Sequence, residues 1–205
     1  MTARSIGLFG GSFNPVHLGH LVMAQDAARA WSLDRVVFIP AALPPHKLTQ
    51  TLVTPAQRLD MLRLALADRE EWEVSDVEVR RGGVSYTIDT VRHFLELEPD
   101  ADLYFIIGGD TLPELHTWRE IDTLLDVCRF ITMVRPGFEP DSLRRADLKL
   151  HPRHLPGLIE RVTVGHLIGI SATDVRMHVA KNESIRYLVP EAVERYIREH
   201  RLYAT

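Results

Sequence analysis

Short apolar runs alternate with stretches of helical periodicity along this 205-residue chain. Residues 6–9 and 36–39 are apolar runs of the kind that form strands covered on both faces. Between them apolar side chains recur at helical spacing, and the helix is expected to end before Asp34. Strand, helix and strand make a βαβ unit whose right-handed crossover leaves the strands parallel. Ligands collect beyond the carboxyl ends of such strands, so the surroundings of Gly10 and Pro40 are the first candidates for a site.

The same alternation continues to the end of the chain. Further strands are expected at residues 72–79, 103–107, 130–134 and 162–167. Further helices are expected after Pro55, after Ser85-Tyr86-Thr87 and in the C-terminal segment around Val193 and Ile197. Residues 138–156 show no clear period, and we expect them to be irregular. The pattern predicts an α/β fold: a Rossmann-like doubly wound parallel sheet with helices on both faces. One domain, residues 1–205, with a small C-terminal helical region accounts for the chain, which shows no repeat, low-complexity run or linker.

Composition restricts the class of protein. Hydrophobic residues make up 45% and charged residues 25%, which are ordinary values for a globular protein. A formal net charge of -4 argues against a general nucleic-acid binder, which carries a surplus of Lys and Arg. No apolar run reaches membrane-spanning length and the N-terminus has no signal-peptide core, so we expect no membrane partner. The single cysteine, Cys128, lies in an apolar stretch, and a reducing cytoplasmic location is expected.

The first expected strand breaks at Gly10-Gly11, just ahead of a helix expected to begin near residues 16–18. Two glycines permit positive φ and let an anion lie against backbone N–H groups at the positive end of the helix dipole. His17 and His20 are three residues apart, so both rings face the turn and can donate to phosphate oxygens. Each feature alone has a plainer explanation, an ordinary turn or two surface histidines. Metal binding is a third alternative, but two histidines without a nearby Cys or carboxylate make a poor zinc site.

A second candidate anion site follows the last expected strand. Ser171 and Thr173 fall at an expected helix start, where free N–H groups bind anions. Arg176 comes three residues after Thr173 and therefore shares its face of the helix. The alternative explanation is an ordinary N-cap followed by a surface arginine.

The end of the strand expected at residues 103–107 carries a third group of candidates. Gly108 allows a ligand to approach the backbone closely, and the Asp110 carboxylate can accept from ribose hydroxyls, as in other nucleotide-binding folds. Asp110 can equally be a helix cap. Trp118, a little further on, is by its type a core residue, although its flat face also suits a heterocyclic ligand.

Three loops carry weaker candidates. His46 and Lys47 lie in a proline-rich loop after the second strand, which is either a stiff surface connector or a source of two cations for phosphate. Arg135 follows the strand expected at residues 130–134, and its alternative role is a solvated loop charge. Ser85 or Thr87 is expected to act as the N-cap of the helix that follows.

Taken in order, these motifs resemble those of a known family. His17-Leu18-Gly19-His20 is similar to the (H/T)xGH signature of the nucleotidyltransferase superfamily, and residues 10–17, GGSFNPVH, resemble the opening of bacterial nicotinate-nucleotide adenylyltransferases. The resemblance runs from about residue 5 to residue 203 and is weakest over residues 138–156. It implies adenylyl transfer from ATP to nicotinate mononucleotide, which gives nicotinate adenine dinucleotide and pyrophosphate in a step of NAD biosynthesis.

The resemblance also implies a role for each candidate. Catalytic roles fall to His17, His20 and Arg176. ATP and its phosphates are assigned to Gly10, Gly11, Ser12, Phe13, Gly108, Asp110, Ser171 and Thr173. The other substrate is assigned to His46, Lys47, Thr87, Trp118 and Arg135, with Trp118 against the pyridine ring and the first two near the phosphates. Mg²⁺ is expected to arrive with ATP, so no residue is assigned to a resident metal. This assignment requires the anion sites at the two ends of the chain to converge on one triphosphate.

Departures from the family pattern leave other functions open. Ala41-Ala42 stands where relatives often carry Asn, and Ala172 and Val175 interrupt the pattern Ile-Ser-Ser-Thr-x-Ile-Arg. A sibling adenylyltransferase with another phosphate acceptor is one alternative, and the pyridine-side residues tell against it. A catalytically silent dinucleotide sensor is another, and the retained cations tell against that. The sequence leaves open the preference for nicotinate over nicotinamide mononucleotide and the oligomeric state, including a homo-oligomer.

Overall fold

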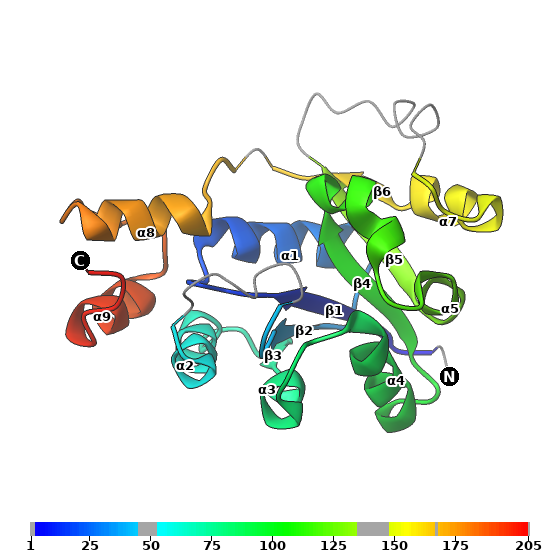
Figure 1. Ribbon diagram of the computed structural model, residues 1–205, viewed down its shortest axis with the longest axis horizontal. Coiled ribbons are helices and arrows are strands. Elements are labelled where there is room, and N and C mark those ends of the chain that lie inside the picture. The colour runs from blue at the N-terminus through cyan, green and yellow to red at the C-terminus, as the bar shows by residue number, and fades with distance from the viewer. Residues whose placement is uncertain (1–2, 45–52, 135–147, 167, 205) are drawn as a thin grey trace.

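A single parallel sheet positions the functional elements of this protein. The computed structural model describes residues 3–44, 53–134, 148–166 and 168–204. Six strands pair in parallel in the order β3-β2-β1-β4-β5-β6 (Figure 1). Their bounds are β1 Ser5–Gly11, β2 Arg35–Pro40, β3 Trp72–Val74, β4 Asp102–Gly108, β5 Arg129–Val134 and β6 Val162–Val164. The chain proceeds outward from β1 to one edge and then from β4 to the other, so the strand order reverses between β1 and β4.

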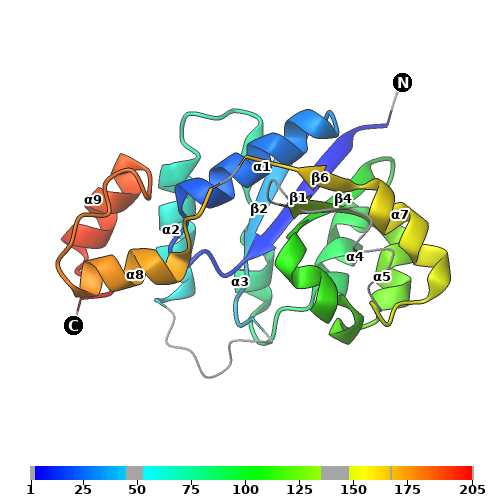
Figure 2. The same cartoon turned by 90° about the horizontal axis from the view of Figure 1, so that it is seen from above.

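Helices cover both faces of the sheet, which is why its strands are apolar on both sides. In β1 the side chains of Ile6 and Leu8 belong to one hydrophobic core and that of Phe9 belongs to the other. Figure 2 shows the helices of the Phe9 side, α1 (Leu18–Ala30) and α2 (Pro55–Ala65), opposite α4 (Thr87–Leu97), α5 (Ile121–Val127) and α7 (Leu155–Glu160). The predicted Rossmann-like, doubly wound α/β fold is confirmed.

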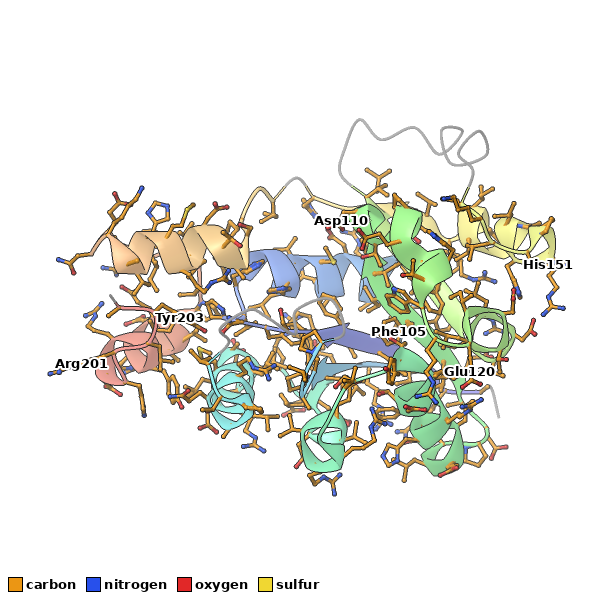
Figure 3. The ribbon with its side chains drawn as sticks, in the orientation of Figure 1. Phe105, Asp110, Glu120, His151, Arg201 and Tyr203 are labelled. Atoms are coloured by element: carbon orange, nitrogen blue, oxygen red, sulfur yellow. The ribbon has the colours of Figure 1, made fainter. Side chains whose placement is uncertain are left out.

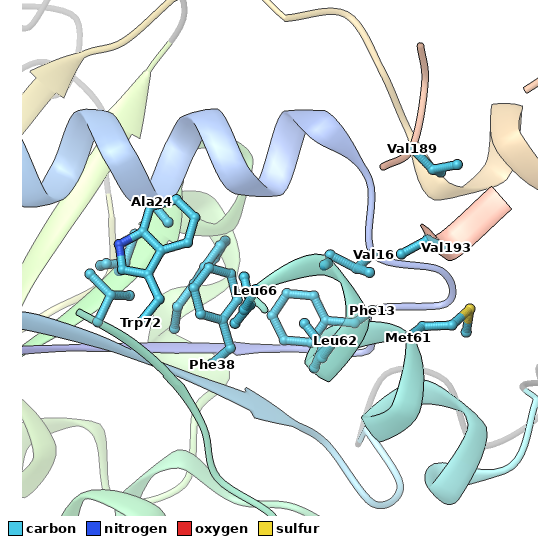
Figure 4. Packing of buried hydrophobic residues seen from close by; sticks show 14 of the residues in the cluster. Phe13, Val16, Ala24, Phe38, Met61, Leu62, Leu66, Trp72, Val189 and Val193 are labelled. Carbon is cyan, nitrogen blue, oxygen red and sulfur yellow. The ribbon is translucent and has the colours of Figure 1, made fainter. Parts of the chain in front are cut away.

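A row of aromatic rings links the edge of the sheet to the loop after β1 (Figure 4). The ring of Phe38 lies with its centroid 5.5 Å from that of Trp72 on β3 and 5.9 Å from that of Phe13. Phe13 also meets Phe9 edge-on at 5.6 Å. The Phe13 side chain is 1% exposed, so the loop that follows β1 is anchored in the core at its start.

The C-terminal region returns to the start of α1. After β6 come α8 (Ala172–Ala180) and α9 (Glu191–Glu199), which lie beyond one end of the sheet in Figure 1. The Leu18 amide donates to the Leu188 carbonyl at 2.9 Å, and the Tyr196 hydroxyl donates to Asp60 on α2 at 3.1 Å. These contacts place the last helices beside the elements that start the chain. None of the helices in the described ranges is long and apolar enough to cross a membrane.

The strand predicted at residues 72–79 is only half correct. Pairing with β2 ends at Val74, where the Ser75 amide donates to the Phe38 carbonyl at 2.9 Å. The next residues form a short helix, α3 (Val77–Arg81), that ends at Gly82, whose φ of 68° favours glycine. An edge strand has a neighbour on one side only, so alternation alone did not reveal where its pairing stops.

Residues 152–156 correct a second prediction, because they are helical although residues 138–156 were expected to be irregular. A 3₁₀ turn, η3 (Pro152–His154), leads directly into α7, and both begin with a proline in the first turn. Proline is tolerated there because its missing N–H has no intrahelical acceptor to lose. The strand expected at residues 162–167 is also shorter than predicted, because β6 ends at Val164.

Helix α2 offers a matched pair of substitutions for measuring how much burial in the core stabilises the fold. Leu62 is 0% exposed and Leu64, on the opposite face, is 40% exposed. We expect Leu62→Ala to lower the free energy of unfolding by about 3 kcal/mol, because it removes a buried side chain and leaves a cavity. Leu64→Ala should change it by less than about 0.5 kcal/mol. Urea unfolding of the two variants checks the difference, and equal losses would contradict the packing described here.

Candidate active site

A cavity of about 950 Å³ lies beyond the carboxyl ends of β1, β4 and β5. In open α/β sheets this edge, at the point where strand order reverses, is where ligands bind. Eight residues singled out from the sequence line it: Ser12, His17, His20, Gly108, Asp110, Ser171, Thr173 and Arg176. They come from the beginning, the middle and the end of the chain, and Figure 3 shows Asp110 past the end of β4. The structure therefore brings the two candidate anion sites to one cavity.

His17 and His20 form a stacked pair at the start of α1. His17 is the N-cap residue and His20 is the third residue of the helix, so their ring centroids lie 3.7 Å apart with 28° between the planes. The His20 Nδ1 accepts from the His17 backbone amide at 3.2 Å. An imidazole nitrogen that accepts carries no proton, so the neutral ring of His20 keeps its proton on Nε2.

His17 is buried in the cavity wall and is uncharged. Its side chain is 6% exposed, and no described residue makes a hydrogen bond to its Nδ1. Burial lowers the pKa of His17 to about 4, and the nearby Asp174 carboxylate opposes this only in part. At neutral pH the His17 imidazole is therefore neutral, which avoids placing a buried cation against the ring of His20.

Arg176 joins the end of the chain to its beginning. Its Nη1 donates to the Asn14 carbonyl at 2.8 Å, and its Nη2 donates to the Thr173 hydroxyl at 3.1 Å. Ser171 lies at a helix start, as predicted; it is the N-cap of α8, and its hydroxyl accepts from the Asp174 amide at 3.1 Å. The guanidinium is thus fixed beside a helix start, where N–H groups and the dipole favour an anion.

Asp110 folds back over the end of β4. A Cβ at Gly108 would collide with the Asp110 carboxylate, so only glycine allows this arrangement. Asp110 lies in the first turn of the 3₁₀ helix η2 (Gly109–Thr117), and Gly108 is its N-cap residue, so Asp110 does not cap it. Its carboxylate remains on the cavity wall.

Comparison with known proteins identifies the family. The model of the cytidylyltransferase-like family matches residues 8–178. A probable nicotinate-nucleotide adenylyltransferase of Opitutus terrae is 46% identical over 198 residues, which cover 97% of each chain. Another, of Desulfitobacterium hafniense, is 40% identical over 205 residues, covering 98% of this chain and 96% of the relative. This chain belongs to the nicotinate-nucleotide adenylyltransferase family.

Solved structures of this enzyme family share the fold. The Plasmodium falciparum nicotinic acid mononucleotide adenylyltransferase complexed with NaAD matches with a TM-score of 0.74 at 19% identity, over 98% of this chain and 97% of that chain. The same enzyme complexed with APC matches with a TM-score of 0.71 at 18% identity, with the same coverage. The likeness spans the sheet, its helices and the C-terminal region alike.

The two glycines that end β1 play a different part from the one predicted. Gly10 and Gly11 do not have positive φ; Phe13 does, at 44°. A Cβ at Gly10 would come within 2.9 Å of the Phe105 ring, and one at Gly11 within 3.1 Å of the Phe13 ring. The glycines therefore make room for aromatic side chains, and neither they nor Phe13 line the cavity. Neither Gly10 nor Gly11 uses the positive φ that glycine permits.

The pyridine-side candidates of the family pattern lie apart from the cavity wall. Trp118 is half-buried, and its ring meets those of Phe105 and Phe130 edge-on at 5.9 and 6.0 Å. Thr87 is the first residue of α4, but the N-cap is Tyr86, so the expected capping by Ser85 or Thr87 was wrong. Ser85 instead accepts from the backbone amide of residue 42 at 2.9 Å. Three further candidates lie outside the described residues: His46, Lys47 and Arg135.

Two titratable residues that line the cavity, Asp26 and His166, were missed by the sequence analysis. Asp26 accepts from the His166 backbone amide at 2.7 Å and from its ring Nδ1 at 2.8 Å. This pair ties α1 to the segment between β6 and α8. Six residues place Asp26 about 120° around α1 from His20, so helical spacing did not mark it as a neighbour of the histidines. Nothing in the sequence marked His166.

The buried His17 predicts a stability that falls as the solution becomes acidic. The unfolded chain binds a proton on this side chain near pH 6.5 and the folded chain only near pH 4. The unfolded state therefore holds more protons between these values, so the free energy of unfolding decreases as pH falls. From about pH 8 to about pH 5 this group alone should remove roughly 2 kcal/mol. Urea unfolding over that range measures the change.

His17→Asn is the control for this titration, because asparagine is itself a preferred N-cap and has no charge to gain. As pH falls between the same two values, the free energy of unfolding of the wild type should decrease by roughly 2 kcal/mol more than that of the variant. Parallel pH profiles of the two proteins would show that His17 titrates in the folded state as it does in the unfolded chain.

Proposed function

We propose that this chain transfers the adenylyl group of ATP to nicotinate mononucleotide, forming nicotinate adenine dinucleotide and releasing pyrophosphate in a step of NAD biosynthesis. The observation that carries the proposal is the convergence of His17 and His20, from the start of the chain, with Arg176, from near its end, on one cavity. Such a set of donors suits the polyphosphate of ATP, and the names of the relatives point to the same reaction.

The chemistry needs no protein base. A phosphate monoester has a second pKa of about 6, so the phosphate of nicotinate mononucleotide is already ionised at neutral pH. One of its oxygens forms a bond to the α-phosphorus of ATP. The bond from that phosphorus to the bridging oxygen of the β-phosphate breaks, and its electron pair leaves with pyrophosphate. The protein's task is to hold two anions in line and to stabilise the charge on the leaving group.

The histidine pair meets the first part of that task. His20 offers its Nε2 proton to a phosphate oxygen, because its Nδ1 already accepts from the His17 amide. An arriving polyphosphate places negative charge beside His17 and so raises the pKa that burial had lowered. A higher pKa favours the protonated, positively charged imidazole when the ligand is in place.

Arg176 and the start of α8 meet the second part. A guanidinium has five N–H donors, and the bonds to Asn14 and Thr173 occupy two of its nitrogens without exhausting them. We assign the β- and γ-phosphates to Arg176, Ser171 and Thr173, and the α-phosphate region to the histidines. Asp110 is assigned to the ribose, because its carboxylate can accept hydrogen bonds from ribose hydroxyls.

The remaining assignments complete the proposal. Thr87 and Trp118 are proposed to hold the pyridine half, and His46, Lys47 and Arg135 to contact the nicotinate mononucleotide or its phosphate. Mg²⁺ is proposed to enter with the triphosphate: no group of three or more His, Cys, Asp or Glu among the described residues could hold a metal ion. Mg²⁺ bound through phosphates keeps several of its waters and needs few protein ligands. A cytoplasmic location and homo-oligomer formation stay predictions.

A test of substrates separates this reaction from its alternatives. Pyrophosphate release should be measured from Mg²⁺-ATP mixed with nicotinate mononucleotide, nicotinamide mononucleotide or phosphopantetheine. We expect release with nicotinate mononucleotide, and the ratio of the first two rates gives the preference for acid over amide. Release with phosphopantetheine alone would identify a sibling transferase. Binding of NAD-like ligands without any release would identify a sensor.

His20 provides the sharpest test of the site. We expect His20→Ala to lower turnover by about 100-fold or more, the scale of losing one preorganised donor to a developing charge. The urea midpoint should move only slightly, since the helix loses one weak capping contact. His200→Ala, exposed after the end of α9, is the matched control and should retain wild-type turnover. A near-normal rate in His20→Ala would remove His20 from the mechanism.

A further inference from the structure

Asn14 connects the end of the chain to the proposed pyrophosphate site. It is 2% exposed, and its Oδ1 accepts from the Tyr203 hydroxyl at 2.9 Å and from the Val53 amide at 3.3 Å. Because a backbone amide only donates, the Val53 contact shows which side-chain atom is oxygen, and the Tyr203 hydroxyl must then be a donor. The Asn14 carbonyl accepts from Arg176. Tyr203 and Arg176 are therefore bonded to the same residue.

Arg58 holds the backbone segments that neighbour Asn14. Its side chain is 0% exposed, and its three nitrogens donate to the carbonyls of Ser12 at 2.9 Å, residue 42 at 3.1 Å and Val53 at 3.3 Å. Burial lowers the pKa of Arg58, so these carbonyls compensate for the loss of water around the guanidinium. Arg58 thereby fixes the backbones of Ser12 and Val53, and the Val53 amide and the Tyr203 hydroxyl both donate to Asn14.

The backbone at the end of the chain is bent to bring Tyr203 to Asn14. Arg201 and Tyr203 have φ of 49° and 61°, in the left-handed region that bulky residues rarely adopt. Leu202 between them is 7% exposed and packs into the core. Burial raises the pKa of the Tyr203 phenol, against the opposing effect of the nearby positive charges of Arg176 and Arg58. The phenol stays protonated, and able to donate, across physiological pH.

We propose that Tyr203 is a positioning residue for adenylyl transfer, which acts through Asn14 to hold the Arg176 guanidinium where it receives the leaving pyrophosphate. The proposal rests on the function proposed above for Arg176. With its side chain held at Oδ1, Asn14 presents its carbonyl to Arg176 in one orientation. Without the tyrosine hydroxyl, Asn14 loses one of its restraints, and Arg176 loses a fixed acceptor.

Two tyrosines in the C-terminal region allow a matched test. Tyr203→Phe and Tyr196→Phe each remove one hydroxyl and keep the ring, but the Tyr196 hydroxyl donates to Asp60 on α2, away from the cavity wall. Calorimetric titration with Mg²⁺-pyrophosphate measures the phosphate site without requiring any turnover. We expect Tyr203→Phe to weaken pyrophosphate binding by roughly five- to tenfold, the scale of one hydrogen bond, and Tyr196→Phe to leave it unchanged. Equal weakening in both variants would mean that Tyr203 acts only through general stability.

A double-mutant cycle decides whether Tyr203 acts through Arg176. Once Arg176→Ala has removed the guanidinium, adding Tyr203→Phe should weaken pyrophosphate binding by less than about twofold more. Losses that multiply in the double variant would overturn the proposal, as would a wild-type protein that does not bind pyrophosphate. Absence of adenylyl transfer by the wild type with nicotinate mononucleotide would instead overturn the proposed function, so the two failures are distinguishable.

Discussion

The hydrogen bond between the Arg176 guanidinium and the Asn14 carbonyl is the contact on which the rest of the site depends. It joins residues 162 positions apart and brings the start of α8 against the loop that follows β1. Neither segment makes a polyphosphate site alone. Together they set two histidines on one wall of a cavity and an arginine with a helix start on another. The doubly wound sheet makes this meeting possible, because all of its strands direct their carboxyl ends to the same edge.

Burial constrains the cationic side chains in and beside this site. His17 is desolvated and neutral, and the buried Arg58 donates hydrogen bonds to three backbone carbonyls. A buried histidine that ionised without a counterion would cost stability, so the folded protein favours its neutral form. A polyphosphate supplies the missing negative charge. Under the proposed function, polyphosphate binding and protonation of His17 are therefore coupled.

The family motifs were readable because their geometry is local. His17 and His20 share a face by helical spacing, and Ser171 begins α8 in the structure as the N-cap rule predicts. Local reasoning failed where the cause was distant. Gly10 and Gly11 are required by the rings of Phe105 and Phe13, and not by a left-handed turn. Chain neighbours alone gave no sign of those contacts.

The sequence by itself determined the alternation of strands and helices, the parallel sheet and the positions of the two candidate anion-binding segments, because periodicity reports which face of an element is buried. It also supplied the resemblance through which individual roles were assigned. Only the tertiary structure decided that the segments converge, that Asp26 meets His166, and that Tyr203 reaches Asn14 across 189 positions. The physical reason is that the spacing of apolar residues along the chain shows which face of an element is buried. Which distant residue packs against that face depends on the crossovers and loop paths of the fold.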